Sequence, residues 1–563
     1  MTPAGMRPIW TRLGLDGTGD GMTRGRTSLL AGVVGLIGVP VEAAELPGER
    51  RKGPAEAVRI CPASGTGFFT IPGSDTCLRV SGRARFEYAF QNAYSRNSAG
   101  DISGYQSRAR INFDARTQTD YGALRGFTRI DVGSRTGFAT MHAGAFNRIG
   151  NAFPATGVDT AGRVQQQVTL DKAFVQFSGL TAGRASSFFD FYAHDFEFIV
   201  ASLGSNIPST NLAAYTAKLG RGFSTTLSVE DPHFRQTAVY SSQNARPLTP
   251  GLDGGFAARA VAPIFVGSGA DGAPTGIGFV DAAQRSRVPD LVGVLRYDDT
   301  WGAAQASAAL HEVGPGTLDR DAYLGTHLGA PASPTNSRDA GRAPAAYGFA
   351  VQGGVKVNLS ALAPGDTLYL QAAYGEGTAL YTGLPAYVGP YAQAATAIQG
   401  APFSQFLNDA VLNPLTNRLE LSTSVSVTAA VLHYWTPSVR SAAFGSYGRM
   451  TFAPGARRVQ GLASAVTGTG PGVPGTRFFE LSQVLRDSDR FVVGANLIWS
   501  PVKEFDIGVE AIYTRYGVQD GRVLDLSRVP TPNAGFVNDP ANAVATVTGV
   551  DAVQIRARVQ RDF

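Results

Sequence analysis

Arginine alternates with apolar residues in several segments of the chain. In CLRVSGRARFEYAF (Cys77–Phe90), Arg79, Arg83 and Arg85 belong to one alternating set, while the other set, from Leu78 to Phe90, is apolar. Because successive residues of a β-strand point to opposite faces, this segment predicts a strand with one apolar face and one basic face. The chemistry open to the basic face is electrostatic: it attracts anions and pairs with carboxylates.

The same pattern returns in RARINFDAR (Arg108–Arg116) and in VQIRARVQRDF (Val553–Phe563). Charges in a dry interior would be strongly destabilising, so we expect the basic face to line a space that holds water. The arginines predicted to line this space are Arg79, Arg83, Arg85, Arg108, Arg110, Arg125, Arg129, Arg556 and Arg558. In the alternative interpretation, several of them pair along the wall with Glu87, Asp114, Asp131 or Asp562.

A second candidate segment is acidic and rich in aromatic residues. Ser186–Asn211 carries Asp190, Asp195 and Glu197 among six aromatic rings. A wholly exposed loop rarely contains so many rings, so we expect them to anchor the loop against a wall or a neighbouring subunit. The three acids would then point into the water-filled space and face the arginines, and opposed charges across a narrow wet pore select among ions.

Catalysis is poorly supported. His194 lies near Ser186 and Ser187, but no G-x-S-x-G motif accompanies them, and no two histidines have the helical spacing of metal ligands. The two cysteines, Cys61 and Cys77, cannot form a closed zinc site alone. We therefore predict no enzyme activity, no cofactor and no metal.

Many strands must position these residues. A soluble sandwich would explain one alternating strand, but it explains less well why very short links alternate strictly with long ones. The sequence predicts sixteen strands, starting near residues 78, 107, 122, 168, 180, 211, 222, 290, 302, 346, 366, 420, 438, 490, 505 and 550. Seven short turns are predicted at 118–122, 178–180, 220–222, 298–302, 361–366, 435–438 and 500–505, and eight long, irregular loops separate the other strand pairs.

This arrangement predicts an all-β fold, a transmembrane antiparallel barrel over residues 78–563 with its short turns on the periplasmic side. A closed barrel leaves no unpaired strand edge in lipid, and one of sixteen strands is wide enough to hold an aqueous channel. The mean hydropathy of -0.03 agrees, because lipid-facing and lumen-facing residues alternate and cancel. The net charge of +5 and the lack of a Lys/Arg-rich block argue against a nucleic-acid partner.

The first residues are typical of an exported protein. Arg24 and Arg26 precede an apolar run, and small residues end at Ala43, so we predict a signal peptide over residues 1–43 and a translation start at Met22. A periplasmic segment with a disulfide is predicted over residues 44–77. Cys61 and Cys77 should pair in an oxidising compartment, which would stabilise the fold by roughly 3 kcal/mol.

Several segments resemble the outer-membrane porins of alphaproteobacteria. They include Cys61–Tyr88, Ala173–Tyr192 and WSPVKEFDIGVEAIYTR (Trp499–Arg515), and the resemblance runs with interruptions from about residue 44 to residue 563. It departs most in the long loops, especially residues 231–289. The resemblance implies a homotrimer of sixteen-stranded barrels in the outer membrane of a Gram-negative bacterium, with the third loop folded inward. It also implies that the barrel-assembly machinery reads the terminal Phe563.

The function expected from these features is passive diffusion of small hydrophilic solutes and ions through a water-filled channel. The other expected partners are the outer-membrane lipids and lipopolysaccharide. We expect a slight preference for anions, against which the acidic third loop acts. The alternative is a substrate-specific channel, or a receptor that uses its long outer loops.

Overall fold

The computed structural model describes residues 59–92, 102–137, 165–205, 209–240, 242–244, 260–268, 270, 274–315, 343–385, 401–529 and 533–563. The predicted signal peptide, the start at Met22 and the first part of the periplasmic segment, up to residue 58, lie outside the described residues. These three assignments therefore stay predictions.

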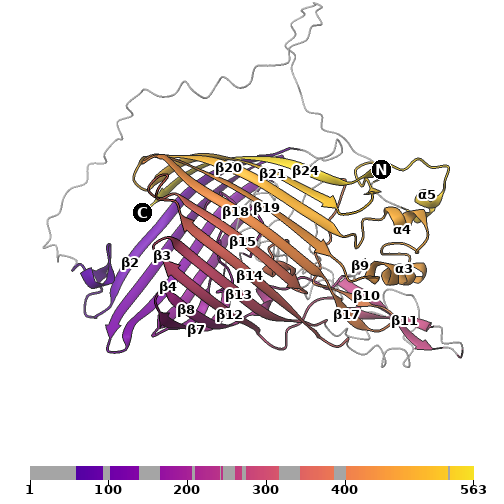
Figure 1. Ribbon diagram of the computed structural model, residues 1–563, viewed down its shortest axis with the longest axis horizontal. Helices are drawn as coiled ribbons and strands as arrows, with labels where there is room; N and C mark the ends of the chain where they lie inside the picture. The colour runs from indigo at the N-terminus through magenta and orange to yellow at the C-terminus, as the bar shows by residue number, and fades with distance from the viewer. Residues whose placement is uncertain are drawn as a thin grey trace, which may run out of the picture. The chain divides into compact units, whose positions relative to one another are not determined.

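Sixteen long strands close into an antiparallel barrel (Figure 1). Each strand pairs with the next along the chain, and the last strand, β24, pairs with the first, β2. The barrel strands are β2 (Cys77–Gln91), β3 (Ser103–Thr119), β4 (Gly122–Gly137), β5 (Gln165–Phe177), β6 (Leu180–Ala185), β7 (Thr210–Gly220), β8 (Phe223–Glu230), β12 (Asp290–Asp299), β13 (Gly302–Val313), β14 (Ala346–Asn358), β15 (Thr367–Glu376), β18 (Thr423–Thr436), β19 (Val439–Thr451), β20 (Ser488–Val502), β21 (Phe505–Val518) and β24 (Gly549–Asp562).

The predicted barrel is confirmed, and every predicted strand start lies within four residues of an observed one. The seven short turns and the eight long links are also where the sequence predicts them. The predicted faces are correct as well: Val80 and Phe86 are 45% and 47% exposed on the outside of β2, whereas Glu87 is only 3% exposed. Alternation identified these strands because each has one face toward lipid and one toward the interior.

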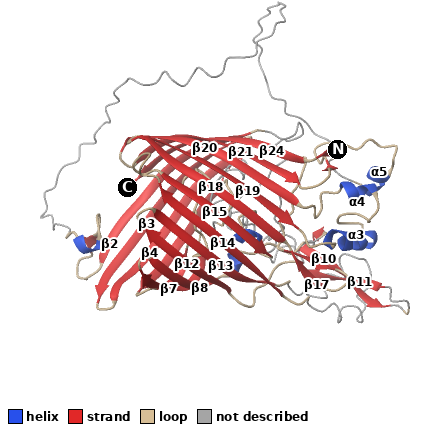
Figure 2. Ribbon diagram, viewed as in Figure 1, coloured by secondary structure: helices blue, strands red, loops and turns tan. Residues whose placement is uncertain are grey.

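The long loops are more regular than the irregular links that the sequence predicts. Figure 2 shows their helices and additional strands at the end of the barrel opposite the short turns. The additional elements of the long loops are β9 (Gln243–Asn244), β10 (Ala260–Ser268), β11 (Pro274–Asp281), β16 (Ala410–Asn413), β17 (Arg418–Leu421), β22 (Val523–Leu524), β23 (Thr546–Val547), α3 (Ala456–Thr467), α4 (Arg477–Leu481) and α5 (Ala534–Asn538). The short strand β1 (Phe69–Thr70) precedes the barrel and pairs with the start of β2. Among the described residues, no helix is both long enough and apolar enough to span a membrane.

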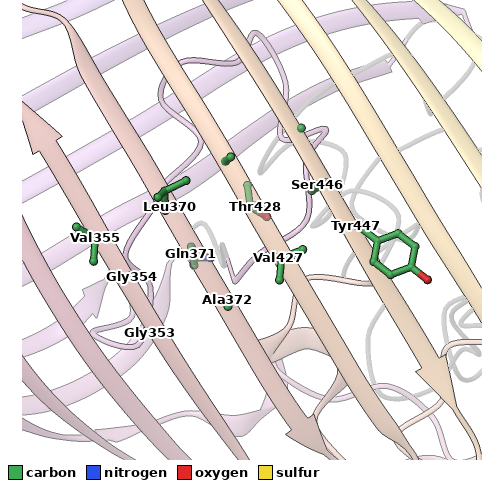
Figure 3. A pocket seen from close by; sticks show the side chains of 12 residues that line it. Gly353, Gly354, Val355, Leu370, Gln371, Ala372, Val427, Thr428, Ser446 and Tyr447 are labelled. Atoms are coloured by element: carbon green, nitrogen blue, oxygen red, sulfur yellow. The ribbon is translucent and has the colours of Figure 1, made fainter. Parts of the chain in front are cut away.

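The outer surface of the barrel carries a shallow apolar groove of about 560 Å³ across β14, β15, β18 and β19 (Figure 3). The groove lies where small residues such as Gly353, Ala372 and Gly445 replace the larger side chains of the surrounding surface. Val427 and Tyr447, at its edge, are 46% and 40% exposed. The groove therefore belongs to the apolar outer face of the barrel.

The barrel closes where the last residue meets the first barrel strand. Gly82 and Phe563 exchange two backbone hydrogen bonds of 2.8 and 3.1 Å. The ring of Phe563 lies over Gly82 so closely that a Cβ added there would come within 2.9 Å of Phe563 Cε2. The two residues thus form the closing seam of the sheet.

We expect Gly82→Val to impair barrel assembly, because its side chain would displace the ring of Phe563 and crowd the backbone of Arg110. Overpacking of this kind destabilises by about 1–3 kcal/mol. The assembled fraction can be measured by the heat-modifiable migration of the folded barrel on gels. Gly126→Val is the matched control, since a Cβ at Gly126 meets nothing within 4 Å. Equal assembly of the two variants would contradict this account of the seam.

Candidate permeation path

The third long loop, residues 186–209, lies inside the barrel along one side of its wall. The first part of the loop, Phe188 to Phe198, is bonded to inward-facing side chains of β13, β14, β15, β20 and β21. Its second part, Ala201 to Leu203, is bonded to side chains of β20, β19 and β18. The bonds join Gln305 to the carbonyl of Phe188, Gln352 to that of Phe189, Gln371 to the amide of Tyr192, Asn496 to the carbonyl of Phe196, Glu510 to the amide of Phe198, Arg490 to the carbonyl of Ala201, and Ser446 and Thr428 to the amide and carbonyl of Leu203.

Aromatic side chains anchor the loop, as the sequence predicts. Phe189, Tyr192 and Phe198 are at most 4% exposed. Phe189 packs with Val292, Ala309 and Ala350 of the wall, and Tyr192 packs with Ala430 and Phe444. The rings therefore bury apolar surface on both sides of the contact, which is the main stabilising contribution available to a loop without regular structure.

Inward-facing glycines make room for this packing. A Cβ added at Gly354 of β14 would overlap the ring of Phe191, and one added at Gly508 of β21 would come within 2.7 Å of Phe198. A Cβ added at Gly448 of β19 would lie 2.5 Å from the Cδ1 atom of Leu203. The sequence analysis did not identify these glycines, because glycine is frequent throughout the chain and only the position of the loop gives these three a role.

The three acids of the loop have different surroundings. Asp195 is exposed, as expected of a residue that faces water. Asp190 is nearly buried and forms an ion pair of 2.9 Å with Arg235. Glu197 is fully buried, so the expectation that its carboxylate faces the lumen was wrong.

Glu197 instead holds the loop together. It bonds to the Nδ1 atom of His194 at 3.0 Å, and it accepts hydrogen bonds from the amides of Ala201 and Ser202 at 2.8 and 3.0 Å. Burial alone raises the pKa of the Glu197 carboxyl, but His194 and Ser202 hold that pKa below its ordinary value. The Nδ1 atom of His194 also lies 2.8 Å from the hydroxyl of Ser202, and among the described residues His194 makes no hydrogen bond to Ser186 or Ser187, the serines that lie near it in the sequence.

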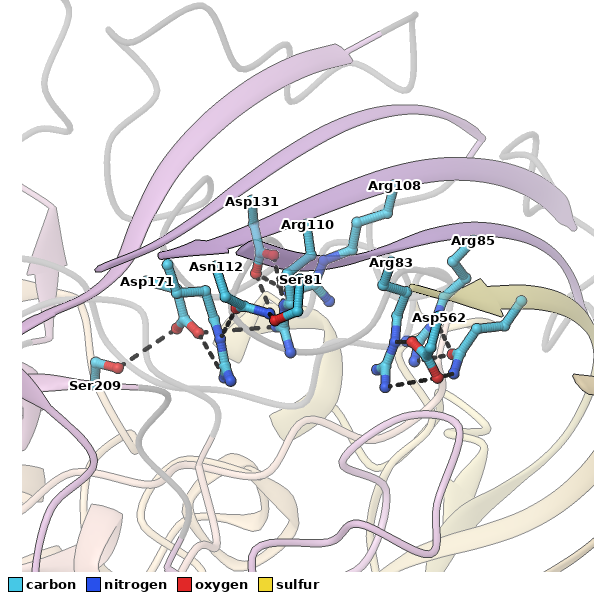
Figure 4. Close-up of polar contacts among 12 residues, drawn as sticks. Ser81, Arg83, Arg85, Arg108, Arg110, Asn112, Asp131, Asp171, Ser209 and Asp562 are labelled. Atoms are coloured by element: carbon cyan, nitrogen blue, oxygen red, sulfur yellow. Dashed lines mark hydrogen bonds and ion pairs between the residues drawn. The ribbon is translucent and has the colours of Figure 1, made fainter. Parts of the chain in front are cut away.

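The predicted arginines lie on β2, β3, β4 and β24, and Figure 4 shows Arg83, Arg85, Arg108 and Arg110 among them. Arg558 of β24 reaches the third loop, where it donates to the carbonyl of Phe198 and lies over its ring at 4.1 Å. Eight of the nine have side chains that are 11–40% exposed. Arg556 differs from the expectation, since it is only 1% exposed. We call the inner face of β2–β5 and β24 the basic wall.

The arginines of the basic wall are paired with the acids that the alternative interpretation named. Arg83 pairs with Asp562 at 2.5 Å, and Arg110 pairs with Asp131 at 2.8 Å. The remaining pairs join Arg108 to Asp131, Arg79 and Arg125 to Asp114, and Arg558 to Glu87. Asp171, which sequence analysis did not single out, lies at an irregularity in β5 and pairs with Arg129 at 3.5 Å. The pairs fix the guanidinium groups in place while leaving most of them partly exposed.

The N-terminal segment covers the periplasmic end of this wall. Cys61 and Cys77 form the predicted disulfide, with their Cα atoms 6.0 Å apart. Phe68, 2% exposed, lies between the guanidinium groups of Arg79 and Arg116, at 5.0 and 4.6 Å from their central carbons. The segment closed by the disulfide thereby holds Arg79 and Arg116 at this end of the barrel.

Residues 49–544 match the model of the porin subfamily. The chain belongs to this porin subfamily. It is 26% identical to porin Omp2b of Brucella suis over 265 residues, which are 46% of this chain and 58% of that protein. It is 30% identical to the putative outer membrane protein y4fJ of Sinorhizobium fredii over 172 residues, 29% of this chain and 43% of the other. These matches span less than two thirds of the relatives' lengths.

Among solved structures, the outer membrane channel DcaP of Acinetobacter baumannii is similar to this porin over 88% of the chain and 99% of its own, with 12% identity and a TM-score of 0.46. The family and the sixteen-stranded barrel together make this porin a β-barrel protein of the Gram-negative outer membrane.

The basic wall of the porin has a strong excess of positive charge. Its described residues include twelve basic side chains and five acidic ones. The basic residues are Arg79, Arg83, Arg85, Arg108, Arg110, Arg116, Arg125, Arg129, Arg135, Lys172, Arg556 and Arg558, and the acidic residues are Glu87, Asp114, Asp131, Asp171 and Asp562. The net formal charge of these described side chains is therefore +7, and such walls favour anions in a wet pore.

We expect Asp114→Asn to increase the preference of the porin for anions. Asp114 is bonded to Arg116 at 3.0 Å and to Arg125 at 2.9 Å, and it lies 3.7 Å from Arg79. Its loss would remove one of the five negative charges of the basic wall. The reversal potential in a salt gradient should then shift further toward the anion limit. Asp520→Asn, at an exposed position in the loop after β21, is the control, and a shift in the opposite direction for Asp114→Asn would contradict the assignment.

Proposed function

We propose that this protein forms a water-filled channel for the passive diffusion of small hydrophilic solutes and ions, with a preference for anions. The observation that supports this most is the position of the third loop. The loop is bonded along β13–β21 and meets the basic wall at Arg558, so the loop and the rest of that wall can line one passage. The partly exposed arginines of that wall and the exposed Asp195 are the charged groups that a passing ion would meet.

The proposal includes the residues that line the channel. Arg79, Arg83, Arg85, Arg108, Arg110, Arg125, Arg129 and Arg558 would line it directly, while Arg556 would act from beneath the surface of the wall. Asp195 would be the charge on the loop side. The protein would have no catalytic activity: His194 of the third loop bonds to Glu197 and Ser202, and all three residues are at most 6% exposed, so a substrate could not reach them.

The assembly and its surroundings are part of the same proposal. A homotrimer is supported by the family resemblance of the sequence. The apolar outer face would contact outer-membrane lipid and lipopolysaccharide, and Phe563 at the closing seam would be read by the barrel-assembly machinery. Cross-linking of the purified protein in detergent should give a species of three chains.

Liposome swelling tests the diffusion of solutes. Vesicles that contain the purified protein should swell in neutral sugars at rates that fall with sugar size and rise linearly with concentration. Saturation of the rate by one sugar or one small anion would instead support the substrate-specific channel. Absence of swelling with every solute, from a protein that is folded by heat-modifiable migration, would contradict the proposal.

A further inference from the structure

A segment of the loop after β8 is buried inside the outer mouth of the barrel. Residues Arg235 to Tyr240 are each at most 2% exposed, although they form no regular strand. We call residues 235–240 the strut. No pattern in the sequence predicts burial here, since the segment lies in the loop that departs most from the family pattern.

The strut is bonded on both sides to other outer loops. The amide of Thr237 donates to Asp409 at 2.8 Å, and the amide of Tyr240 donates to the carbonyl of Ala410 at 2.8 Å. The amide of Val239 donates to the carbonyl of Ala282 at 2.9 Å. Because its backbone groups are paired with neighbours that are themselves buried, the strut is a fixed part of the mouth rather than a surface loop.

Arg235, at the inner end of the strut, contacts the third loop. Its Nη2 atom lies 2.9 Å from Oδ1 of Asp190, and its Nη1 atom donates to the hydroxyl of Ser205 at 2.5 Å. The guanidinium lies over the ring of Tyr381 at 4.3 Å. Asp190 and Ser205 are near the two ends of the third loop, so the side chain of Arg235 joins the first part of the loop to its last part.

This contact is buried, unlike an ion pair at the surface. The side chain of Arg235 is 0% exposed and that of Asp190 is 9% exposed. Burial lowers the pKa of Arg235, but Asp190 and its other acidic neighbours raise that pKa above the ordinary value, so the side chain stays charged. Removing one partner of a buried pair is strongly destabilising, because the other charge is left without compensation.

We propose that Arg235 is a positioning residue that latches the third loop, so that the loop after β8 sets the width and the charge of the channel. The inference rests on the proposed function, since it concerns the channel that the third loop narrows. The loop after β8, in which no motif was found, would thus have a role in the channel. The geometry of the constriction would depend on Arg235, which lies outside the constriction.

The test is Arg235→Met, recorded as single channels in planar bilayers beside the unchanged protein. A methionine of similar length removes the charge and every hydrogen bond. We expect the variance of the open-channel current to roughly double as the third loop loosens, and the preference for anions to fall because Asp190 has lost its counter-charge. Arg458→Met is the matched control, because Arg458 is an exposed arginine on α3 in another outer loop.

Two further variants separate the charge from the packing. The double variant Arg235→Met with Asp190→Asn removes both charges, so we expect the reversal potential to return toward that of the unchanged protein while the current stays noisy. A role limited to packing would leave the double variant with the reversal potential of Arg235→Met. Arg235→Lys keeps the charge and should show a smaller increase in noise.

The outcomes distinguish the inference from the proposed function. If the unchanged protein does not conduct, the proposed function fails. If it conducts and Arg235→Met matches it in both noise and reversal potential, the latch is wrong and the channel stands. If Arg235→Met does not assemble, Arg235→Lys decides: noise above that of Arg458→Met supports the latch, and noise equal to it overturns the latch.

Discussion

Gly354→Val is expected to push the third loop into the lumen and to roughly halve the single-channel conductance. A Cβ at this position would overlap the ring of Phe191, with the Cε1 atom only 2.8 Å away. The strand cannot retreat, because Gly354 is paired with Gln305 of β13 on one side and with Gln371 of β15 on the other. The ring must therefore move toward the side that is open, which is the passage beside the basic wall.

The neighbouring glycine provides the matched control. Gly353 lies on the same strand but faces outward, and a Cβ added there meets nothing within 4 Å. Gly353→Val should therefore assemble and conduct like the unchanged protein. Equal conductance in the two variants would show that the third loop does not narrow the passage at Phe191.

The second large effect concerns the choice between anions and cations. Replacing Arg83, Arg110 and Arg129 together by Gln should move the reversal potential in a salt gradient well toward the cation side. These side chains are 31%, 20% and 25% exposed, so ions can approach them. The substitution would reduce the excess of basic over acidic residues on the basic wall by three, and it would leave the acids Asp562, Asp131 and Asp171 with fewer partners.

The single variants Arg83→Ala and Arg110→Ala should shift the reversal potential in the same direction by less. Arg458→Gln, on the outer helix α3, adds or removes no charge on the basic wall and should leave the potential unchanged. If neither single variant nor the triple variant moves the reversal potential, the basic wall does not line the path of the ions.

The fold could be predicted from the sequence because a membrane barrel repeats two simple constraints. Every strand must show lipid an apolar face, which produces the alternation seen from Leu78 to Phe90, and every turn on one side is short. The alternative interpretation named Asp562 among the acids that pair with the wall arginines, and Arg83 forms this pair across the closing seam, where the first and last strands meet.

The interior of the barrel was harder to predict, because it depends on contacts between loops that are distant in sequence. In the sequence, Glu197 has the surroundings expected of an acid that faces the lumen. In the structure, its carboxylate accepts hydrogen bonds from the amides of its own loop. Arg235 and the strut have no periodicity that would mark them as buried. Their burial follows from partners such as Asp190 and Asp409, which only the folded loops bring near them.

The most direct test of the account is a recording of single channels in a planar bilayer with a salt gradient across it. We expect ohmic current steps, grouped in threes, and a reversal potential whose sign shows a preference for anions. A folded protein that gives no current would contradict the open channel. Ohmic steps with a preference for cations would keep the channel but contradict the central claim that the basic wall controls the passage.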